Sequence, residues 1–479
     1  MNRNRNNLKS TIFVVTFLFS SFLSLSITNS VIYSLQNGNS ENMTDDLTKD
    51  MTDELVEDMG FYNGIGQIFN ARTDDNIIVK VFRYHAPGEI FNDGAQPVLL
   101  FPGLGCNINV FLSYSTPTMK EKFDITLPEN LAGWAVGDEK IKDDPLLYYS
   151  IAYYLWKMGY DPWFGNYRGI GYGEMRSEGG DGGTSMDHFA LYDVKAAVKK
   201  VHEITGMHPA IGGHSTGGLT SMMYLHGTTF GADGHVQRYD ALTNERNGIT
   251  EGPETVAGFI GIDPAAIPVL PALMNNVLIW TLLSTDLIVE AGDLMGTLMD
   301  IELIDMLYQN MLSLIVDADI LGETLTDFMK NTGNLDITNV NEEILYYFFR
   351  YGVGRMYYRT LSQYLDFYVH QCIREYWKNG MVDNIPLEPP IPGDMDGYYY
   401  YTDNMDKIQV PLICFLADAE GDILDLVDAD QIMRDYVNGK TENENDECYS
   451  IESAHIDIGL GLRNPECMFP QLGTWLAKI

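Results

Sequence analysis

The sequence is poor in basic residues. Thirty lysines and arginines stand against 67 aspartates and glutamates in 479 residues, which gives a formal net charge of -37. A surface of that sign repels phosphate backbones and anionic lipid headgroups, so nucleic-acid binding is not expected. The charge bears on solubility and association and says nothing about the fold.

Cysteine is also scarce. The five cysteines are Cys106, Cys372, Cys414, Cys448 and Cys467, which permit at most two disulfides with one thiol left over. The pairing we favour joins Cys448 to Cys467. The chain has no CxxC spacing and no histidine-rich stretch. We therefore expect neither a metal nor any other cofactor.

Long apolar runs are rare, and the clearest one covers residues 11–27. Arg3, Arg5 and Lys9 precede it. A basic start followed by a short apolar run is typical of a secretory signal peptide, which we place at residues 1–30. The run is just shorter than a membrane-spanning helix, so an uncleaved signal anchor is the alternative. Either way, we expect a secreted protein or one in the lumen of the endomembrane system.

Residues 31–60 are polar and acidic and contain the N-glycosylation sequon Asn42-Met43-Thr44. This composition predicts a flexible segment rather than a packed element. The whole chain, in contrast, is 45% hydrophobic and 12% aromatic. That is enough to bury a large core in one domain with an insertion.

Short apolar segments alternate with helical patterns over residues 61–267, and the alternation resumes over residues 406–479. This predicts an α/β fold with a mainly parallel, doubly wound sheet. Between them, residues 268–405 carry Leu, Met and Tyr at helical spacings, which predicts an inserted helical cap. The expected strands are 67–69, 77–81, 97–101, 161–165, 209–213, 256–262 and 410–415. The expected helices include 148–158, 189–204 (with a buried apolar stripe that ends at Ile204), 219–225 and 467–478.

Ser215 lies in the pentapeptide Gly213-His214-Ser215-Thr216-Gly217. By itself GxSxG is weak evidence in a chain with 45 glycines. Here it stands between an expected strand and an expected helix, which is the setting of a nucleophile elbow. The sharp turn needs small neighbours because the following helix approaches closely. The backbone N–H of Thr216 would then point at a developing oxyanion.

A serine nucleophile needs a histidine base, and that histidine needs a carboxylate to orient it. Only His455 follows the last expected strand and precedes the final helix, in a loop with Gly459 and Gly461. His226 and His370 fall in helical patterns, where an ordinary packed or surface histidine is expected. We therefore predict His455 as the base.

Three carboxylates compete for the acid position. Asp422 is favoured, because it follows Gly421 shortly after the expected strand 410–415 and precedes a helical pattern. Glu420 is the next candidate. Asp263, at the end of the preceding expected strand, is the third, because some lipases take their acid from that place.

Several blocks resemble the acid lipase family, the gastric and lysosomal lipases that hydrolyse triacylglycerols and cholesteryl esters. The most specific block is GYDPWFGNYRG at residues 159–169. The others include TDDNII at 73–78, PGL at 102–104, GHS at 213–215 and HID at 455–457. The resemblance covers most of the chain after about residue 65 and implies an α/β-hydrolase fold with a Ser-Asp-His triad. Ser215 and His455 match that triad, whereas Pro102 and Thr216 replace the family's histidine and glutamine.

These observations predict a secreted or lumenal serine hydrolase that cleaves carboxylic esters, with lipid esters as the favoured class, through an acyl-enzyme at Ser215. His455 would act as base and then acid, and Asp422 would orient it. The backbone N–H groups of Leu104, in the glycine turn after strand 97–101, and of Thr216 would bind the oxyanion.

Apolar clusters of the cap, such as residues 346–349, would form a pocket for an acyl chain. The expected partner is a lipid or small-molecule ester, with a transient contact at a lipid interface as an option. One alternative is another acyl hydrolase, such as a thioesterase, lactonase or peptidase. The other is a binding protein that kept the fold without activity.

Overall fold

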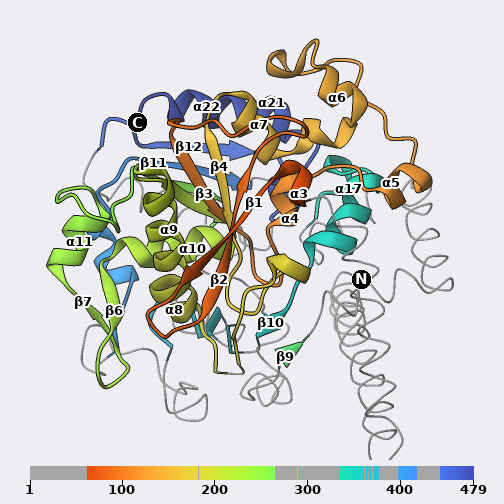
Figure 1. Cartoon of the computed structure of the whole chain (residues 1–479). Coiled ribbons are helices and arrows are strands. Elements are labelled where there is room, and N and C mark those ends of the chain that lie inside the picture. The colour runs from red at the N-terminus through yellow and green to blue at the C-terminus, as the bar shows by residue number, and fades with distance from the viewer. Residues whose placement is uncertain are drawn as a thin grey trace, which may run out of the picture.

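The computed structural model describes residues 62–181, 183–264, 288–289, 335–357, 359–360, 363–364, 366–367, 372–376, 398–417 and 443–479. Its centre is an eight-stranded sheet in the order β1-β2-β4-β3-β5-β8-β11-β12 (Figure 1). The strands are β1 (Gly66–Arg72), β2 (Ile78–Tyr84), β3 (Pro97–Phe101), β4 (Asp161–Gly165), β5 (Ala210–His214), β8 (Gly258–Ile262), β11 (Leu412–Ala417) and β12 (Glu447–Ile451). Strand β2 pairs antiparallel with β1 and β4, and the other pairs are parallel. This mixed, mostly parallel sheet with flanking helices is an α/β-hydrolase fold, as the sequence predicts.

Helices cover both faces of the sheet. Side chains alternate between the two faces along β3, so Leu99 and Phe101 belong to one core cluster and Val98 and Leu100 to the other. The first cluster contains α8 (Met186–His188), the π-helical turn Phe189–Val194, α9 (Lys195–Thr205) and α10 (Thr216–Leu225). The second contains α7 (Ile151–Lys157), α21 (Asn464–Cys467) and α22 (Phe469–Leu476), drawn on the other side of the sheet in Figure 1. Because both faces are covered, every residue of β3, β4, β5, β8 and β11 is buried.

Shorter elements complete the described chain. The helices are α3 (Tyr62–Ile65), α4 (Asn109–Leu112), α5 (Pro117–Lys122), α6 (Glu139–Asp143), α11 (Asp240–Arg246) and α17 (Glu342–Tyr347). Two small antiparallel pairs join β6 (Thr228–Phe230) to β7 (Val236–Arg238) and β9 (Ile288–Val289) to β10 (Met356–Tyr357).

The expected strands 97–101 and 161–165 match β3 and β4 residue for residue. The expected hairpin is the antiparallel pair β1–β2. The expected helix 189–204 is divided into a π-helical turn and α9, and its apolar stripe is buried only as far as Val201. Ile204 is 41% exposed, which corrects that expectation. Strand β12 was not predicted, because its residues carry no clear apolar run.

Part of the expected cap at residues 268–405 lies outside the described residues. The described cap residues 335–357 pack into the core. Tyr346, Tyr347 and Tyr351 are buried, and the ring of Tyr347 lies 5.7 Å from that of Tyr114. Residues 351–354 also bind the loop after β3, as described below. This part of the insertion is therefore built into the hydrolase core.

The expected signal peptide, the segment 31–60 and the sequon at Asn42 lie outside the described residues. Within the residues described, no helix combines the length and apolarity required to cross a bilayer. Cys467 is an exposed free thiol, so the expected disulfide between Cys448 and Cys467 is wrong. Cys448 lies on β12 opposite Cys414 of β11.

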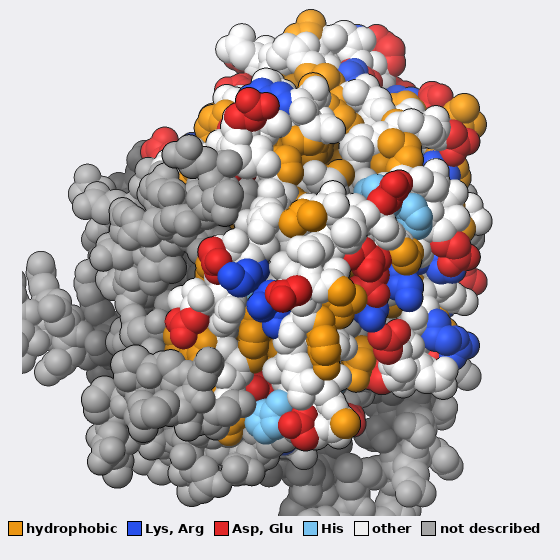
Figure 2. All heavy atoms as spheres, turned by 90° about the vertical axis from the view of Figure 1, so that its left-hand side faces the viewer, with side chains coloured by type: hydrophobic (Ala, Val, Ile, Leu, Met, Phe, Trp, Pro, Cys, Tyr) orange, Lys and Arg blue, Asp and Glu red, His pale blue; other side chains and the backbone are white. Residues whose placement is uncertain are grey.

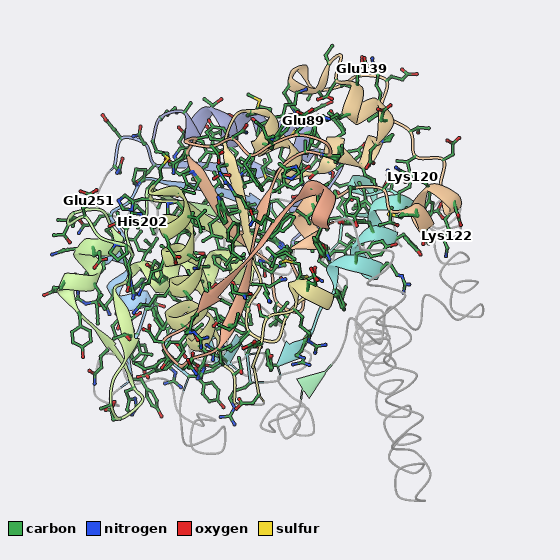
Figure 3. All side chains as sticks on the ribbon, in the orientation of Figure 1. Glu89, Lys120, Lys122, Glu139, His202 and Glu251 are labelled. Atoms are coloured by element: carbon green, nitrogen blue, oxygen red, sulfur yellow. The ribbon has the colours of Figure 1, made fainter. Side chains whose placement is uncertain are left out.

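Acidic and basic side chains are intermingled on the face shown in Figure 2. Many basic residues lie against carboxylates. Lys195 Nζ, for example, is 2.8 Å from Asp74 and 3.1 Å from Glu254. Figure 3 labels several charged side chains around the ribbon, among them Glu89, which pairs with Lys140 at 3.0 Å. Solvent-accessible pairs such as Glu89–Lys140 contribute only about 0–1 kcal/mol each, so the buried core dominates stability.

Candidate active site

Ser215 lies at the turn from β5 to α10. Its φ of +53° and ψ of -118° fall in a region that non-glycine residues rarely adopt. The Ser215 N–H donates to the Ile262 carbonyl at 3.0 Å, which ties the turn to β8. A Cβ at Gly217 would lie 1.9 Å from the Phe101 carbonyl oxygen, so the helix passes β3 too closely for any side chain. These are the properties of a nucleophile elbow.

Three polar side chains form a continuous series at this turn. His455 Nε2 lies 2.8 Å from Ser215 Oγ, and His455 Nδ1 lies 2.5 Å from Asp263 Oδ2. A carboxylate oxygen only accepts, so Nδ1 carries the proton and Nε2 is the acceptor for the serine hydroxyl. Ser215 and His455 lie 240 residues apart in the sequence, and the structure brings them together in one site.

Asp263, the third candidate, is the carboxylate that contacts His455 Nδ1. Asp422 and Glu420 lie outside the described residues. Asp263 directly follows β8, and its N–H donates to the Phe415 carbonyl of the neighbouring β11 at 2.7 Å. Its Oδ1 accepts from the Ala417 N–H at 3.2 Å, which leaves Oδ2 to face the histidine. The end of β8 thus places a carboxylate against His455, at the position of the third alternative considered from the sequence.

His214, which precedes the serine, holds the backbone of His455. Its Nε2 lies 2.6 Å from the His455 carbonyl oxygen, so this nitrogen carries the proton. Burial, with the nearby His455 ring as a second cause, lowers the pKa of His214 to about 4. A neutral His214 is thus a fixed donor that joins the elbow to the loop carrying the base.

The loop that carries His455 is also fixed from its other end. Asp457 Oδ1 accepts from the Asp336 N–H at 2.8 Å, and Asp457 Oδ2 accepts from Asn339 Nδ2 at 2.7 Å. Burial raises the pKa of Asp457 to about 6. This aspartate belongs to the His-Ile-Asp block, and its contacts give that block a structural role in holding the loop.

The glycine loop after β3 lies directly against the serine. A Cβ on Gly103 would be 3.2 Å from Ser215 Cβ. Leu104 and Thr216, the two expected oxyanion donors, line one cavity of about 230 Å³ together with Tyr167 and Tyr357. Thr216 is the first residue of α10, where helix N–H groups have no intrahelical partner. The two positions are therefore close to the serine and to each other.

Residues of the insertion hold this loop in place. Gly354 N–H donates to the Gly105 carbonyl at 2.7 Å. Asn107 Nδ2 donates to the carbonyls of Tyr351 and Val353 at 2.8 and 3.1 Å. The backbone that carries Leu104 is thus restrained by a segment almost 250 residues away in the sequence.

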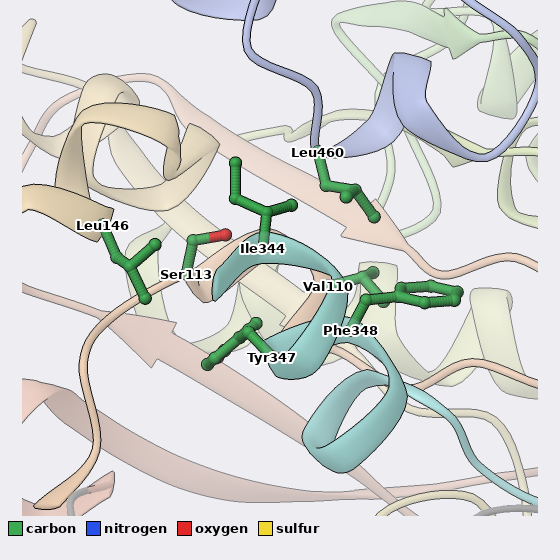
Figure 4. A pocket seen from close by; sticks show the side chains of 7 residues that line it. All are labelled: Val110, Ser113, Leu146, Ile344, Tyr347, Phe348 and Leu460. Carbon is green, nitrogen blue, oxygen red and sulfur yellow. The ribbon is translucent and has the colours of Figure 1, made fainter. Parts of the chain in front are cut away.

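A second cavity of about 240 Å³ is almost entirely apolar (Figure 4). Val110 lies in α4, shortly after the glycine loop, and Leu460 follows the loop of His455. Helix α17 supplies Ile344 and Tyr347, and Phe348 directly follows it. The expected aromatic cluster at 346–349 therefore contributes to an apolar cavity whose walls follow both active-site loops.

Two residues of this region were missed by the sequence analysis. His214 was visible within the GHSTG pentapeptide, but no pattern assigned it a contact. Tyr364 has its hydroxyl 2.8 Å from Thr216 Oγ1, and no motif surrounds it. Among the described residues, no group of three or more His, Cys, Asp or Glu is arranged to hold a metal ion.

Comparisons with known proteins give similarity at the level of structure. No protein-family model and no curated protein matches the chain. The acid-lipase resemblance consequently rests on the quoted blocks alone.

The similar solved structures include DcsB in complex with its substrate analogue, with a TM-score of 0.43, 10% identity, and coverage of 86% of this chain and 98% of that one. A soluble variant of monoglyceride lipase from Saccharomyces cerevisiae has a TM-score of 0.40 and 12% identity, with coverage of 86% of this chain and 95% of that one. Esterase Pf2001 of Pyrococcus furiosus has a TM-score of 0.37 and 11% identity, with coverage of 88% of this chain and 92% of that one. With TM-scores below 0.5, these similarities add no argument about activity.

Proposed function

We propose that this protein is a serine hydrolase that cleaves carboxylic esters through an acyl-enzyme at Ser215. The observation that carries the proposal is the series Asp263–His455–Ser215, with contacts of 2.5 and 2.8 Å. A histidine whose Nδ1 proton is held by a carboxylate presents a free Nε2 lone pair to the serine. That is the arrangement needed to activate a hydroxyl nucleophile.

The reaction follows from these contacts. Ser215 Oγ attacks the acyl carbon while its proton passes to His455 Nε2, and Asp263 stabilises the resulting imidazolium. The N–H groups of Leu104 and Thr216 bind the oxyanion. Collapse of the tetrahedral intermediate expels the alcohol with the proton from His455, and water then attacks the acyl-enzyme by the same route.

The apolar cavity of Figure 4 supports an ester with an aliphatic acyl group. Its lining is almost entirely apolar, which is the chemistry that the acyl end of a lipid ester requires. The acid-lipase blocks in the sequence support the same substrate class.

Hydrolysis of a series of p-nitrophenyl esters, with acyl chains from acetate to palmitate, tests this function. We expect turnover of these esters that is lost by a factor of about 10^6 in Ser215→Ala. A fluorophosphonate probe should label Ser215 in the native chain and leave Ser215→Ala unlabelled. Ester turnover that survives in Ser215→Ala would refute the mechanism.

The same assay separates the other acyl hydrolases. Thioesters, lactones and peptide amides are offered alongside the esters, and a higher kcat/KM for one of them would move the assignment to that class. Absence of turnover with every substrate, together with an unlabelled Ser215, would favour a binding protein on the hydrolase fold.

We also propose that the chain is exported, on the basis of the basic and apolar segment at residues 1–30. Expression of the full chain in a eukaryotic cell should yield a protein that lacks these residues in the medium or in the secretory lumen. Recovery of a cytosolic chain with its original N-terminus would refute export.

A further inference from the structure

Tyr364 reaches the active site from the insertion between β8 and β11. Its side chain is buried, and its hydroxyl lies 2.8 Å from Thr216 Oγ1. The Ser215 side chain is near enough to lower the pKa of the phenol. The tyrosine therefore contacts the residue that carries an expected oxyanion donor and lies beside the nucleophile.

The phenol keeps its proton in this place. Burial raises the pKa of Tyr364 above its usual range, and the contacts with Thr216 and Ser215 oppose that rise only in part. A neutral phenol has one proton to donate and an oxygen that accepts. If the Thr216 hydroxyl donates to the phenol oxygen, the tyrosine proton is directed elsewhere, and Ser215 is the other polar side chain near enough to affect the phenol.

The residues next to Tyr364 hold it in this position. Gln363 Oε1 accepts from the Met186 N–H at 2.9 Å, and Gln363 Nε2 donates to the buried Asp187 at 3.0 Å. Asp366 forms a buried ion pair with Arg374 at 2.8 Å. A hydroxyl held by its neighbours in this way needs little reorganisation when charge develops beside it.

We propose that the Tyr364 hydroxyl is a third hydrogen-bond donor to the oxyanion formed when Ser215 attacks an ester; the inference rests on the proposed function. When the Ser215 Oγ–carbon bond forms, the carbonyl π pair moves onto the oxygen, and the serine proton goes to His455. The phenol donates a hydrogen bond to that oxygen without transferring its proton. When the carbonyl re-forms, the pair returns and the alcohol departs with the proton from His455.

Tyr364→Phe tests the proposal, because it removes one oxygen and keeps the ring. We expect kcat to fall by about 10^2, the usual cost of one oxyanion donor, with KM changed by less than about threefold. The Ki of a trifluoromethyl ketone, whose adduct with Ser215 carries the same oxyanion, should rise in parallel. The variant should melt within a few degrees of the native chain.

Two further variants separate donation to the substrate from support of the fold. Tyr153→Phe removes another buried hydroxyl, one that donates to Asp138 at 2.7 Å outside the active site, and should leave kcat unchanged. Thr216→Val removes the partner hydroxyl and keeps the backbone N–H. If Tyr364 only held Thr216, Thr216→Val would reproduce the loss in Tyr364→Phe; we expect a loss at least tenfold smaller.

The proposal is overturned if Tyr364→Phe keeps native kcat and native Ki for the ketone, or if Thr216→Val matches its losses. If Tyr364→Phe does not fold, the affinities of the ketone and of an uncharged substrate analogue are compared between native and Thr216→Val protein. A loss of affinity in Thr216→Val that is equal for both ligands would also overturn the proposal. Failure of the proposed function is distinct, because native protein would then show no Ser215-dependent turnover.

Discussion

Replacement of Asp263 by asparagine should disable the histidine without disturbing the fold. The position has a φ of +43°, which asparagine tolerates better than most residues. Its two oxygens have different partners: Oδ1 accepts from the Ala417 N–H and Oδ2 from His455 Nδ1. An amide cannot serve both, because one of its two ends is now a donor.

Each orientation of the amide has a cost. If its oxygen stays on Ala417, its NH2 group faces Nδ1 and stabilises the tautomer with a proton on Nε2, which cannot accept the serine proton. If the amide turns, its NH2 group faces the Ala417 N–H, donor against donor. Substitution of this kind in a comparable triad lowers kcat by about 10^4, which corresponds to about 5 kcal/mol of activation free energy.

The assay is the hydrolysis of p-nitrophenyl butyrate, with a thermal melt to check folding. Asp422→Asn and Glu420→Gln are the matched controls and should keep kcat within about threefold of the native value. If Asp263→Asn retained more than about a tenth of native kcat while Asp422→Asn lost about 10^3, the acid would be Asp422 and the reasoning would fail.

Three further predictions concern the frame around the site. Gly217→Ala should destabilise the protein by at least about 1–3 kcal/mol and lower its Tm, because the new Cβ would overlap the Phe101 carbonyl; Gly133→Ala, whose Cβ meets nothing within 4 Å, is the control. Asp193→Ala should cost about 3–5 kcal/mol in chemical denaturation, because it leaves the buried Arg168 without a carboxylate at 2.7 Å; no change would mean that Asp75 suffices. His226, whose pKa burial lowers to about 3, binds its proton only on unfolding between pH 6.5 and 3. Stability therefore falls with falling pH in that window, and His226→Gln should reduce the slope by up to about 1.4 kcal/mol per pH unit; an unchanged slope would contradict a neutral buried His226.

The parts of the site that the sequence could predict are those marked by local pattern. Ser215 stands at a strand–helix turn whose glycines are required by the close approach to β3. His455 was identifiable because the order of elements left one histidine in the loop before the last helix. Both arguments use short-range features, which a single sequence displays.

The acid was not predictable in the same way. In a chain with 67 acidic residues, a carboxylate follows almost any strand, so the choice depends on which strand end faces the histidine. That is decided by the pairing of β8 with β11, where Asp263 bonds to Phe415 and Ala417. Tyr364 was beyond reach for a related reason, since it lies 148 residues from Thr216 in the sequence, within an insertion without strand signals.

The bonds from residues 351–354 to the glycine loop bear on how this fold can change during evolution. In an enzyme whose cap merely covers a finished site, the insertion can be exchanged to alter specificity while the chemistry persists. Here the loop that carries Leu104 takes two of its supports from that insertion, at Gly105 and Asn107. A graft that exchanged residues 268–405 for another hydrolase's cap would remove part of the catalytic frame. Substrate range should therefore evolve through substitutions in the wall of the cavity, at positions such as Ile344, rather than through replacement of the insertion.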